Sequence, residues 1–197
     1  MIKFLPLIFT LFFSSSLSAA SSPYIGLMFE GGYDWLTQER SQEDNLDINP
    51  MVYGAKLNLG IDSGDDLRTN IFFSTHYFDK DIYEYEKGSS HKLLYGVGFD
   101  ILKSYSERGS STAPYLKGGM SYEFMPVDGY AQSWANNVSL LVGFGMLTRM
   151  SDSLELQLGM YYKYRMWGNY NLDTELTKNV ELSDHSVMID LGFNFHY

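Results

Sequence analysis

The sequence predicts an all-β fold: one eight-stranded antiparallel transmembrane β-barrel of the outer-membrane type, preceded by a cleaved signal peptide. Three observations predict it. Eight segments alternate apolar residues with small or charged ones, the N-terminus carries a short apolar run, and the C-terminus is an amphipathic, aromatic-rich segment. The expected division is a signal peptide at 1–20 and a single barrel domain at 21–197.

The first twenty residues have the pattern of an export signal. Lys3 gives a positive start, residues 4–13 are largely apolar, and small residues lead to Ala20. This order is typical of a secretory signal peptide, with cleavage expected after Ala20. The alternative, a membrane-anchoring helix, is disfavoured because the apolar run is too short to cross about 30 Å of hydrocarbon.

The composition excludes some functions. Without residues 1–20, 13 basic and 24 acidic side chains remain, a formal charge of 13 − 24 = −11. Such a chain repels nucleic acid, so no nucleic-acid partner is expected. The sequence contains no cysteine, which excludes disulfides and cysteine-based metal sites. No cofactor or metal is expected.

Strict alternation is the main structural signal. Each apolar face is long enough for a tilted strand of about 9–11 residues to cross a bilayer, and aromatic residues stand at its tips. The expected strands lie around 24–35, 53–62, 67–77, 93–101, 115–124, 138–149, 154–166 and 186–197.

The connections are expected to alternate in length. The shorter ones lie around 62–66, 103–112 and 149–153, and the longer ones around 36–50, 79–91, 125–137 and 168–184. Short turns on one side and long loops on the other are the outer-membrane arrangement, with the long loops outside the cell. An even number of strands then places both ends of the mature chain in the periplasm.

The second face of each strand decides between a membrane barrel and a soluble barrel of the lipocalin type. A soluble barrel would hide its apolar face, whereas here the small and charged face suits a narrow lumen and the large apolar face suits lipid. Asp34 belongs to the charged face. The predicted lumen charge network is Glu30, Lys56, Asp62, Arg68, Asp100, Lys117, Glu123, Arg149, Glu155, Lys163, Arg165 and Asp190. Such charges could form a self-neutralising plug or line a conducting path, and the plug is favoured because buried charges persist when they are paired.

The C-terminus carries the most specific motif. The segment 190–197 has the polar-x-Gly-x-x-aromatic-x-aromatic pattern of the signal that outer-membrane barrels present to their assembly machinery. Its key positions are Asp190, Gly192, Phe195 and Tyr197, the last standing where Phe is commonest. The barrel-assembly machinery is therefore an expected partner.

With these features the chain resembles small eight-stranded outer-membrane barrels, the group of the OmpA transmembrane domain, OmpX/Ail and OmpW-like proteins. The resemblance covers about residues 23–197 and includes the mid-barrel segment Ala113-Pro114-Tyr115-Leu116-x-Gly-Gly. It implies an outer-membrane location and contact with outer-membrane lipid and lipopolysaccharide. It implies little about function.

An enzyme related to lipid A deacylases is the least favoured function, and no catalytic residue is assigned. In that family His and Ser stand two apart on one strand face, whereas His185 and Ser186 are adjacent and should face opposite ways. His76 follows Ser74, and His91 follows Ser89, in the reverse order.

The long loops offer surface features. Acidic residues there could collect divalent cations, although a solvated surface is the simpler interpretation, and loop aromatics could contact an extracellular partner. The acidic set is Glu39, Glu43, Asp44, Asp47, Asp79, Asp81, Glu84 and Glu86, and the aromatic set is Tyr83, Tyr85, Tyr130, Trp134, Trp167 and Tyr170. Three functions follow in order of preference: a structural or surface-interaction barrel, a narrow porin-like channel, and a lipid A-modifying enzyme.

Overall fold

The computed structural model describes residues 21–40, 45–63, 66–80, 92–105, 110–126, 134–168 and 180–197. The expected signal peptide at 1–20 lies outside these ranges. Within them, no helix is long and apolar enough to cross a membrane. The strands are β1 (Ser22–Arg40), β2 (Leu46–Ile48), β3 (Met51–Asp62), β4 (Leu67–Phe78), β5 (Leu93–Ser104), β6 (Thr112–Pro126), β7 (Trp134–Arg149), β8 (Leu154–Trp167) and β9 (Val180–His196).

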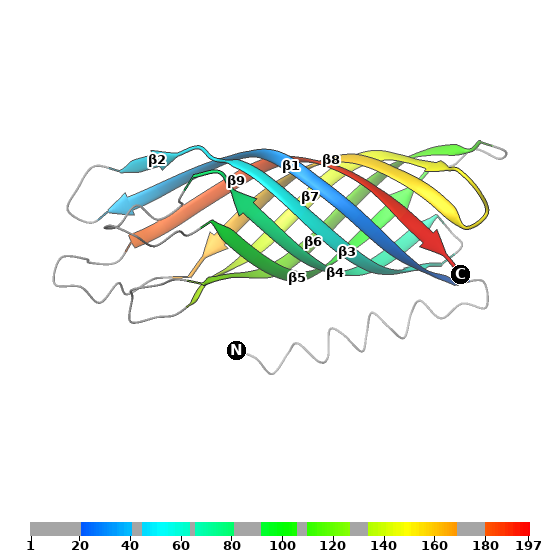
Figure 1. The fold of residues 1–197 in the computed structure, drawn as a ribbon, viewed down its shortest axis with the longest axis horizontal. Coiled ribbons are helices and arrows are strands. Elements are labelled where there is room, and N and C mark those ends of the chain that lie inside the picture. The colour runs from blue at the N-terminus through cyan, green and yellow to red at the C-terminus, as the bar shows by residue number, and fades with distance from the viewer. Residues whose placement is uncertain are drawn as a thin grey trace.

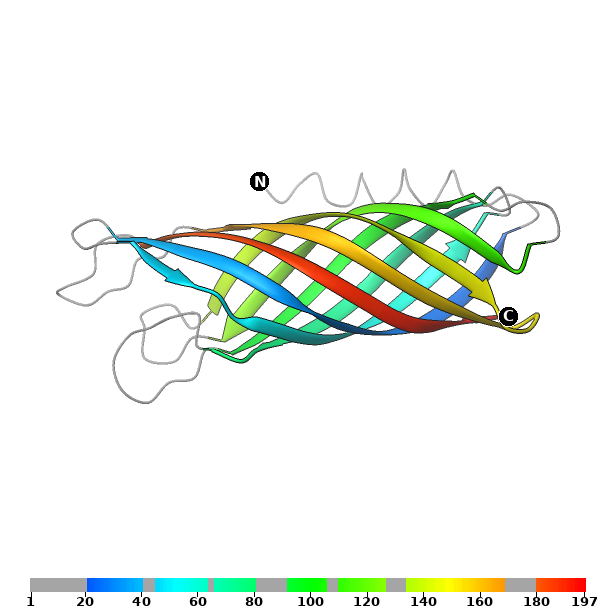
Figure 2. The same ribbon diagram turned by 90° about the horizontal axis from the view of Figure 1, so that it is seen from above.

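The strands form a closed antiparallel barrel (Figures 1 and 2). β1 pairs with β3, each strand from β3 to β8 pairs with the next one along the chain, and β9 returns to pair with β1. This closing seam runs from the pair Tyr24–His196 to the pair Arg40–Val180. The predicted eight-stranded barrel, closed by its own C-terminal strand, is confirmed.

The additional short strand β2 continues the line of β3 along β1. Leu36 pairs with Ile48 in β2, and Tyr33 pairs with Met51 in β3, so β1 keeps one register with both. Pro50 lies between them and has no N–H to donate, which interrupts the ladder without shifting it. Its carbonyl still accepts a hydrogen bond from the backbone N–H of Asp34 at 3.0 Å.

The two ends of the barrel differ. The turn end carries the connections 63–66, 105–111 and 150–153. Ser22 and Tyr197 lie at the same end, where the backbone N–H of Tyr197 donates to the carbonyl of Pro23. At the loop end lie 41–45, 79–92, 127–133 and 168–179. The expected long loop at 36–50 is wrong, because β1 continues to Arg40 and β2, at Leu46–Ile48, interrupts the remainder. The last strand likewise begins at Val180 rather than near 186, since pairing along the seam extends both strands.

Successive side chains of each strand point to opposite faces, as pleating requires. The outward face carries large apolar side chains, among which Val142 is 62%, Phe144 59% and Leu116 55% exposed. The inward face carries the charged and small residues. The face that the sequence assigns to the outside is therefore the exposed one on every barrel strand.

The lumen is not uniformly polar. At the loop end its inward side chains form an apolar layer, which the sequence analysis did not anticipate. These residues stand near the loop-end tips of their strands, inside the barrel: Leu36, Ile48, Val52, Phe78, Leu94, Met125, Ala135 and Leu182. A smaller cluster of Leu102, Tyr115 and Leu147 lies towards the turn end. An eight-stranded interior is just wide enough to be filled by side chains in this way.

Candidate functional site: the charged lumen

The sequence-predicted lumen residues fall into three groups. Ten have buried side chains, and Asp62 is half-buried at the turn end. Arg149 is exposed, so the prediction that it belongs to the buried network is wrong: β7 ends at this residue, which stands at the turn-end rim opposite Glu155. The ten buried residues are Glu30, Lys56, Arg68, Asp100, Lys117, Glu123, Glu155, Lys163, Arg165 and Asp190.

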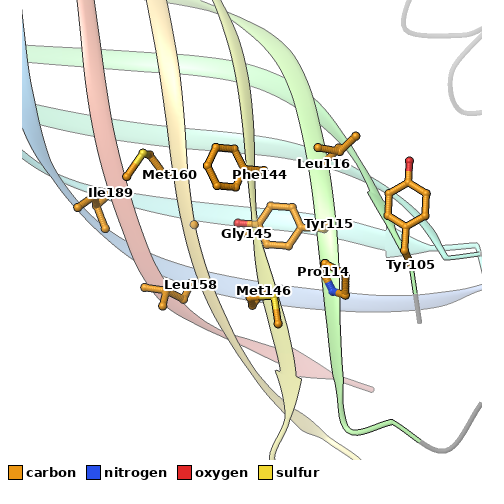
Figure 3. Close-up of a pocket in the computed structure, with 11 residues that line it drawn as sticks. Tyr105, Pro114, Tyr115, Leu116, Phe144, Gly145, Met146, Leu158, Met160 and Ile189 are labelled. Carbon is orange, nitrogen blue, oxygen red and sulfur yellow. The ribbon is translucent and has the colours of Figure 1, made fainter. Parts of the chain in front are cut away.

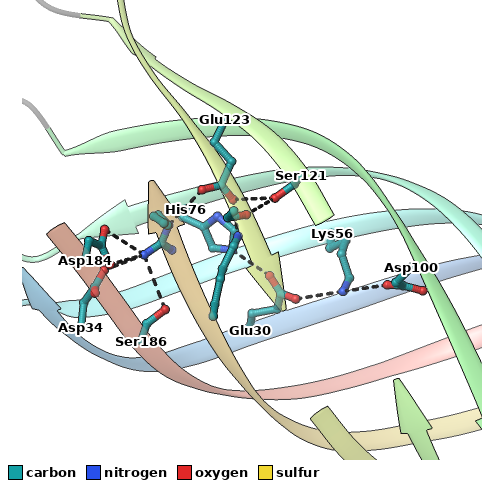
Figure 4. A network of polar contacts seen from close by, with 12 residues as sticks. Glu30, Asp34, Lys56, His76, Asp100, Ser121, Glu123, Asp184 and Ser186 are labelled. Atoms are coloured by element: carbon teal, nitrogen blue, oxygen red, sulfur yellow. Dashed lines mark hydrogen bonds and ion pairs between the residues drawn. The ribbon is translucent and has the colours of Figure 1, made fainter. Parts of the chain in front are cut away.

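Arg165 is the centre of the part of the network nearest the loop end, where its guanidinium carbon lies 5.8 Å from the ring centre of Phe78 in the apolar layer. Figure 4 shows its partners Asp34, Asp184 and Glu123. Its Nη1 lies 2.9 Å from Asp34 Oδ2 and 2.9 Å from Asp184 Oδ1, and its Nε lies 2.9 Å from Glu123 Oε2. Lys163 forms an ion pair with the same Glu123. Three carboxylates from three strands thus converge on one guanidinium, whose planar set of donors suits several acceptors at once.

Asp184 was missed by the sequence analysis, which began the last strand at 186. The signal was present, because Asp184 keeps the alternation of Ser186 and Met188 on the inward face. Trp167 also donates from its indole N–H to Asp184 at 3.3 Å. Ser186 lies 3.5 Å from Arg165 Nη1.

A second group of charges lies in the middle of the barrel. Lys56 Nζ is 3.2 Å from Glu30 Oε1 and 3.9 Å from Asp100 Oδ2. Lys117 pairs with Asp190 and lies 4.4 Å above the ring centre of Tyr161. Such contacts between a cation and a ring face add to the ion pairs at a buried site.

His76 belongs to the second group through Glu30. Its Nε2 lies 2.8 Å from Glu30 Oε2, and its ring is buried. His76 and Ser74 both face the lumen, whereas His185 is exposed and its neighbour Ser186 is buried, as the sequence predicts. Neither serine therefore has a histidine placed to activate it at a surface that a substrate could reach.

The third group closes the turn end. Arg68 Nη2 donates to Glu155 Oε2 at 3.0 Å, and its Nε donates to Asp62 Oδ2 at 2.9 Å. Asn194, from the C-terminal strand, donates to Glu155 at 3.1 Å. The polar lumen thus runs from this end up to the apolar layer.

Carboxylates outnumber cations among the described lumen residues. The exposed Arg149 is not among the buried charges, and Asp184 is added to them. Seven buried carboxylates therefore face five buried cations. The acids are Glu30, Asp34, Asp100, Glu123, Glu155, Asp184 and Asp190, and the bases are Lys56, Arg68, Lys117, Lys163 and Arg165. Several buried polar atoms also have no protein partner, including Asp34 Oδ1, Asn137 Nδ2, His76 Nδ1 and Asp190 Oδ1. Atoms of this kind are usually satisfied by internal water.

Other sequence-based candidates are more limited. In the described part of the chain, no group of His, Asp or Glu is arranged to hold a metal ion. Most of the expected acidic and aromatic loop residues, and the pair Ser89 and His91, lie outside the described residues. In the C-terminal motif, Asp190 and Gly192 face the lumen, while Phe195 is 45% and Tyr197 77% exposed.

Comparison with known proteins supports the fold alone. No protein-family model matches the chain, and no curated protein matches it in sequence. Among solved structures, the chain is similar to the outer membrane protein OprG from Pseudomonas aeruginosa (10% identity, 89% of this chain and 96% of that chain, TM-score 0.54). It is also similar to Neisserial surface protein A (15% identity, 87% of this chain and 97% of that chain, TM-score 0.51).

The chain therefore has the fold of the small eight-stranded outer-membrane β-barrels. A further likeness, to the outer membrane protease OmpT from Escherichia coli, has 6% identity and a TM-score of 0.46 and covers 92% of this chain and 100% of that chain. That likeness is too weak to carry an argument about function.

Proposed function

We propose that this protein is a non-catalytic integral barrel of the Gram-negative outer membrane, with a lumen plugged by its own charges and a structural or surface-interaction role. The observation that carries the proposal is the contrast between the faces of its strands. Large apolar side chains are exposed outside, and ion-paired side chains are buried inside. In water such an outer surface would aggregate, whereas in lipid it is stabilised.

The plug is supported by how the charges are held. Each buried cation has a carboxylate within ion-pair distance, and Arg165 engages three of them. Removing one partner from such a network leaves an uncompensated charge, so the network favours one arrangement of the lumen. The apolar layer closes the same lumen at the loop end.

The orientation follows from the two ends of the barrel. We place the turn end and both ends of the mature chain in the periplasm, and the loop end at the cell surface. In this orientation the terminal strand, with Asp190, Gly192, Phe195 and Tyr197, is the segment that the assembly machinery would recognise. The outward face contacts outer-membrane lipid and lipopolysaccharide, and the acidic loops meet an extracellular partner.

A narrow channel for small solutes is the second candidate. The partnerless polar atoms of Asp34, Asn137 and His76 favour it, because they suggest water inside the lumen. The excess of buried carboxylates would make such a path prefer cations.

Single-channel recording separates the two candidates. The protein is inserted into a planar bilayer, and insertion is verified by its protection from an added protease. We expect a silent membrane for the wild type and for Arg149→Ala, whose side chain lies outside the lumen. Discrete openings of the wild type that change with Lys163→Gln would overturn the plug in favour of the channel.

A separate experiment tests the surface role. Replacing residues 81–91 with a Gly-Ser segment of equal length should leave insertion intact and reduce adhesion of the bacteria to a surface that carries the extracellular partner. Unchanged adhesion for this swap and for a matched swap of 169–179 would contradict a role of these loops.

A further inference from the structure

A groove crosses the outward face of the barrel near the turn end (Figure 3). Its volume is about 810 Å³, and its lining is almost entirely apolar. One wall is a row of side chains at matching positions of four neighbouring strands, β6 to β9: Leu116, Phe144, Met160 and Ile189.

The opposite wall is the next outward row towards the turn end, formed by Pro114, Met146 and Leu158. Between the walls, the floor is the backbone of Gly145 and Gly159, which are paired directly across β7 and β8. A side chain at either position would point into the lumen, where the ring of Tyr115 lies behind this floor. Strands spaced about 4.8 Å apart make the groove roughly 15 Å long.

The groove ends beside β5 at Tyr105, and Lys103 stands near this end. The register continues the first wall from Leu116 to Lys103, and the backbone N–H of Tyr105 donates to the carbonyl of Pro114 in the second wall. Lys103 stands on the outward face and is half-buried, and Tyr105 is 53% exposed. The apolar groove therefore ends at a phenol, and a lysine follows Leu116 in the same row of outward residues.

The groove also rises away from the turn end. Tyr105 immediately follows β5 at this end, whereas Ile189 lies seven positions before the end of β9 at His196. Because the strands are tilted, a line across them climbs from the rim of the barrel into the apolar belt. A molecule lying in the groove would have its polar end at the rim and its apolar end towards the middle of the belt.

We propose that this groove binds one glycerophospholipid of the membrane leaflet at the turn end, with an acyl chain along the groove and the phosphate between Lys103 and Tyr105. The proposal rests on the membrane insertion proposed above. The walls match a hydrocarbon chain, and the lysine and the phenol supply donors for a phosphate at the one end that reaches the rim.

Native mass spectrometry tests the site with the protein purified from bacterial envelopes in a mild detergent and dioleoylphosphatidylglycerol as the added probe. We expect one lipid to remain bound to the wild type. Lys103→Gln should weaken its binding about tenfold, or about 1.4 kcal/mol. Met146→Trp, which fills the groove, should abolish it.

The chain offers matched controls at the loop end. Met166 faces outward with the same 43% exposure as Met146, so Met166→Trp places an equal side chain away from the groove. Lys92→Gln removes an equal charge at that end. Both controls should retain the lipid. Lipid retained by Lys103→Gln or by Met146→Trp as firmly as by the wild type would overturn the proposal. A wild type absent from the envelope fraction would instead overturn the membrane insertion on which it rests.

Discussion

The inner and outer faces of the same strands obey opposite rules, and Arg165 and Tyr164 show this at consecutive positions. The guanidinium of Arg165 has no exposed surface and engages three carboxylates, whereas the ring of Tyr164 is 39% exposed on the outward face. The inner face depends on specific partners, and the outer face depends only on apolar character. The effect of a substitution on stability should therefore depend first on which face carries the residue, and only then on the chemistry of the new side chain.

Arg165→Met should show the largest effect. It leaves Asp34, Asp184 and Glu123 without their shared cation, and breaking such a buried set costs about 3–5 kcal/mol. The free energy of unfolding is measured by urea titration in lipid vesicles, followed by tryptophan fluorescence. Arg149→Met removes an equal charge from an exposed position and should change stability by less than about 0.5 kcal/mol. Equal losses for the two variants would contradict the difference between the faces.

Val142→Arg tests the outer face. Val142 lies halfway along β7 and is 62% exposed, so an arginine there would meet hydrocarbon. The expected cost is about 2–4 kcal/mol in the same titration. Phe195→Arg, one residue from the end of β9, should cost about 0–1 kcal/mol because it lies near the interface. A cost that does not depend on this depth would argue against a membrane-spanning belt.

A pair of glycines sharpens the comparison. A methyl group at Gly159 would collide with the hydroxyl of Tyr115 and the carboxylate of Asp190, whereas one at Gly31 would meet nothing within 4 Å. Gly159→Ala should therefore destabilise the protein by about 1–3 kcal/mol. Gly31→Ala should stay within about 0.5 kcal/mol of the wild type. The shift of the urea midpoint at constant slope measures both changes.

The smallest expected effect concerns two tyrosines of β1. The buried hydroxyl of Tyr24 donates to Asn70 Oδ1, and Asn70 in turn donates to Asp100 at 2.6 Å. Tyr24→Phe removes the donor and should cost about 1 kcal/mol. Tyr33 is 40% exposed on the outer face, so Tyr33→Phe should be close to neutral. Urea titration of both variants measures the two losses of unfolding free energy. A larger loss for Tyr33→Phe than for Tyr24→Phe would contradict the comparison.

The sequence predicted the faces because alternation is a local property of each strand. Every barrel strand was found, and Glu30, Lys56 and Arg165 were placed in the lumen from period alone. The positions at which strands begin and end are not determined by the local sequence in this way. β1 and β9 extend because each supplies the other with backbone partners along the seam. Asp184 is a local sign of the longer β9, because it continues the alternation of Ser186 and Met188, but the partner strand itself lies far away in the sequence.

The candidate site was predicted only in part for the same reason. Asp184 was missed because the start of its strand was missed, and Arg149 was included because the end of its strand was misplaced. The apolar layer was overlooked since Val52, Phe78 and Leu94 stand at strand tips, where the alternation seemed to end. Which cation meets which carboxylate depends on the curvature of the closed sheet, and no sequence spacing encodes it.

The seam has a consequence for how a cell handles this chain. The first barrel strand finds its second neighbour only in the last one, whose paired residues lie 140 to 172 positions away in the sequence. Until β9 has paired with β1, two sheet edges stay open and can recruit another chain. Closure of this seam is thus the step that protects the molecule from edge-to-edge aggregation. A chain cut short before 180 should be a substrate for degradation rather than a smaller barrel.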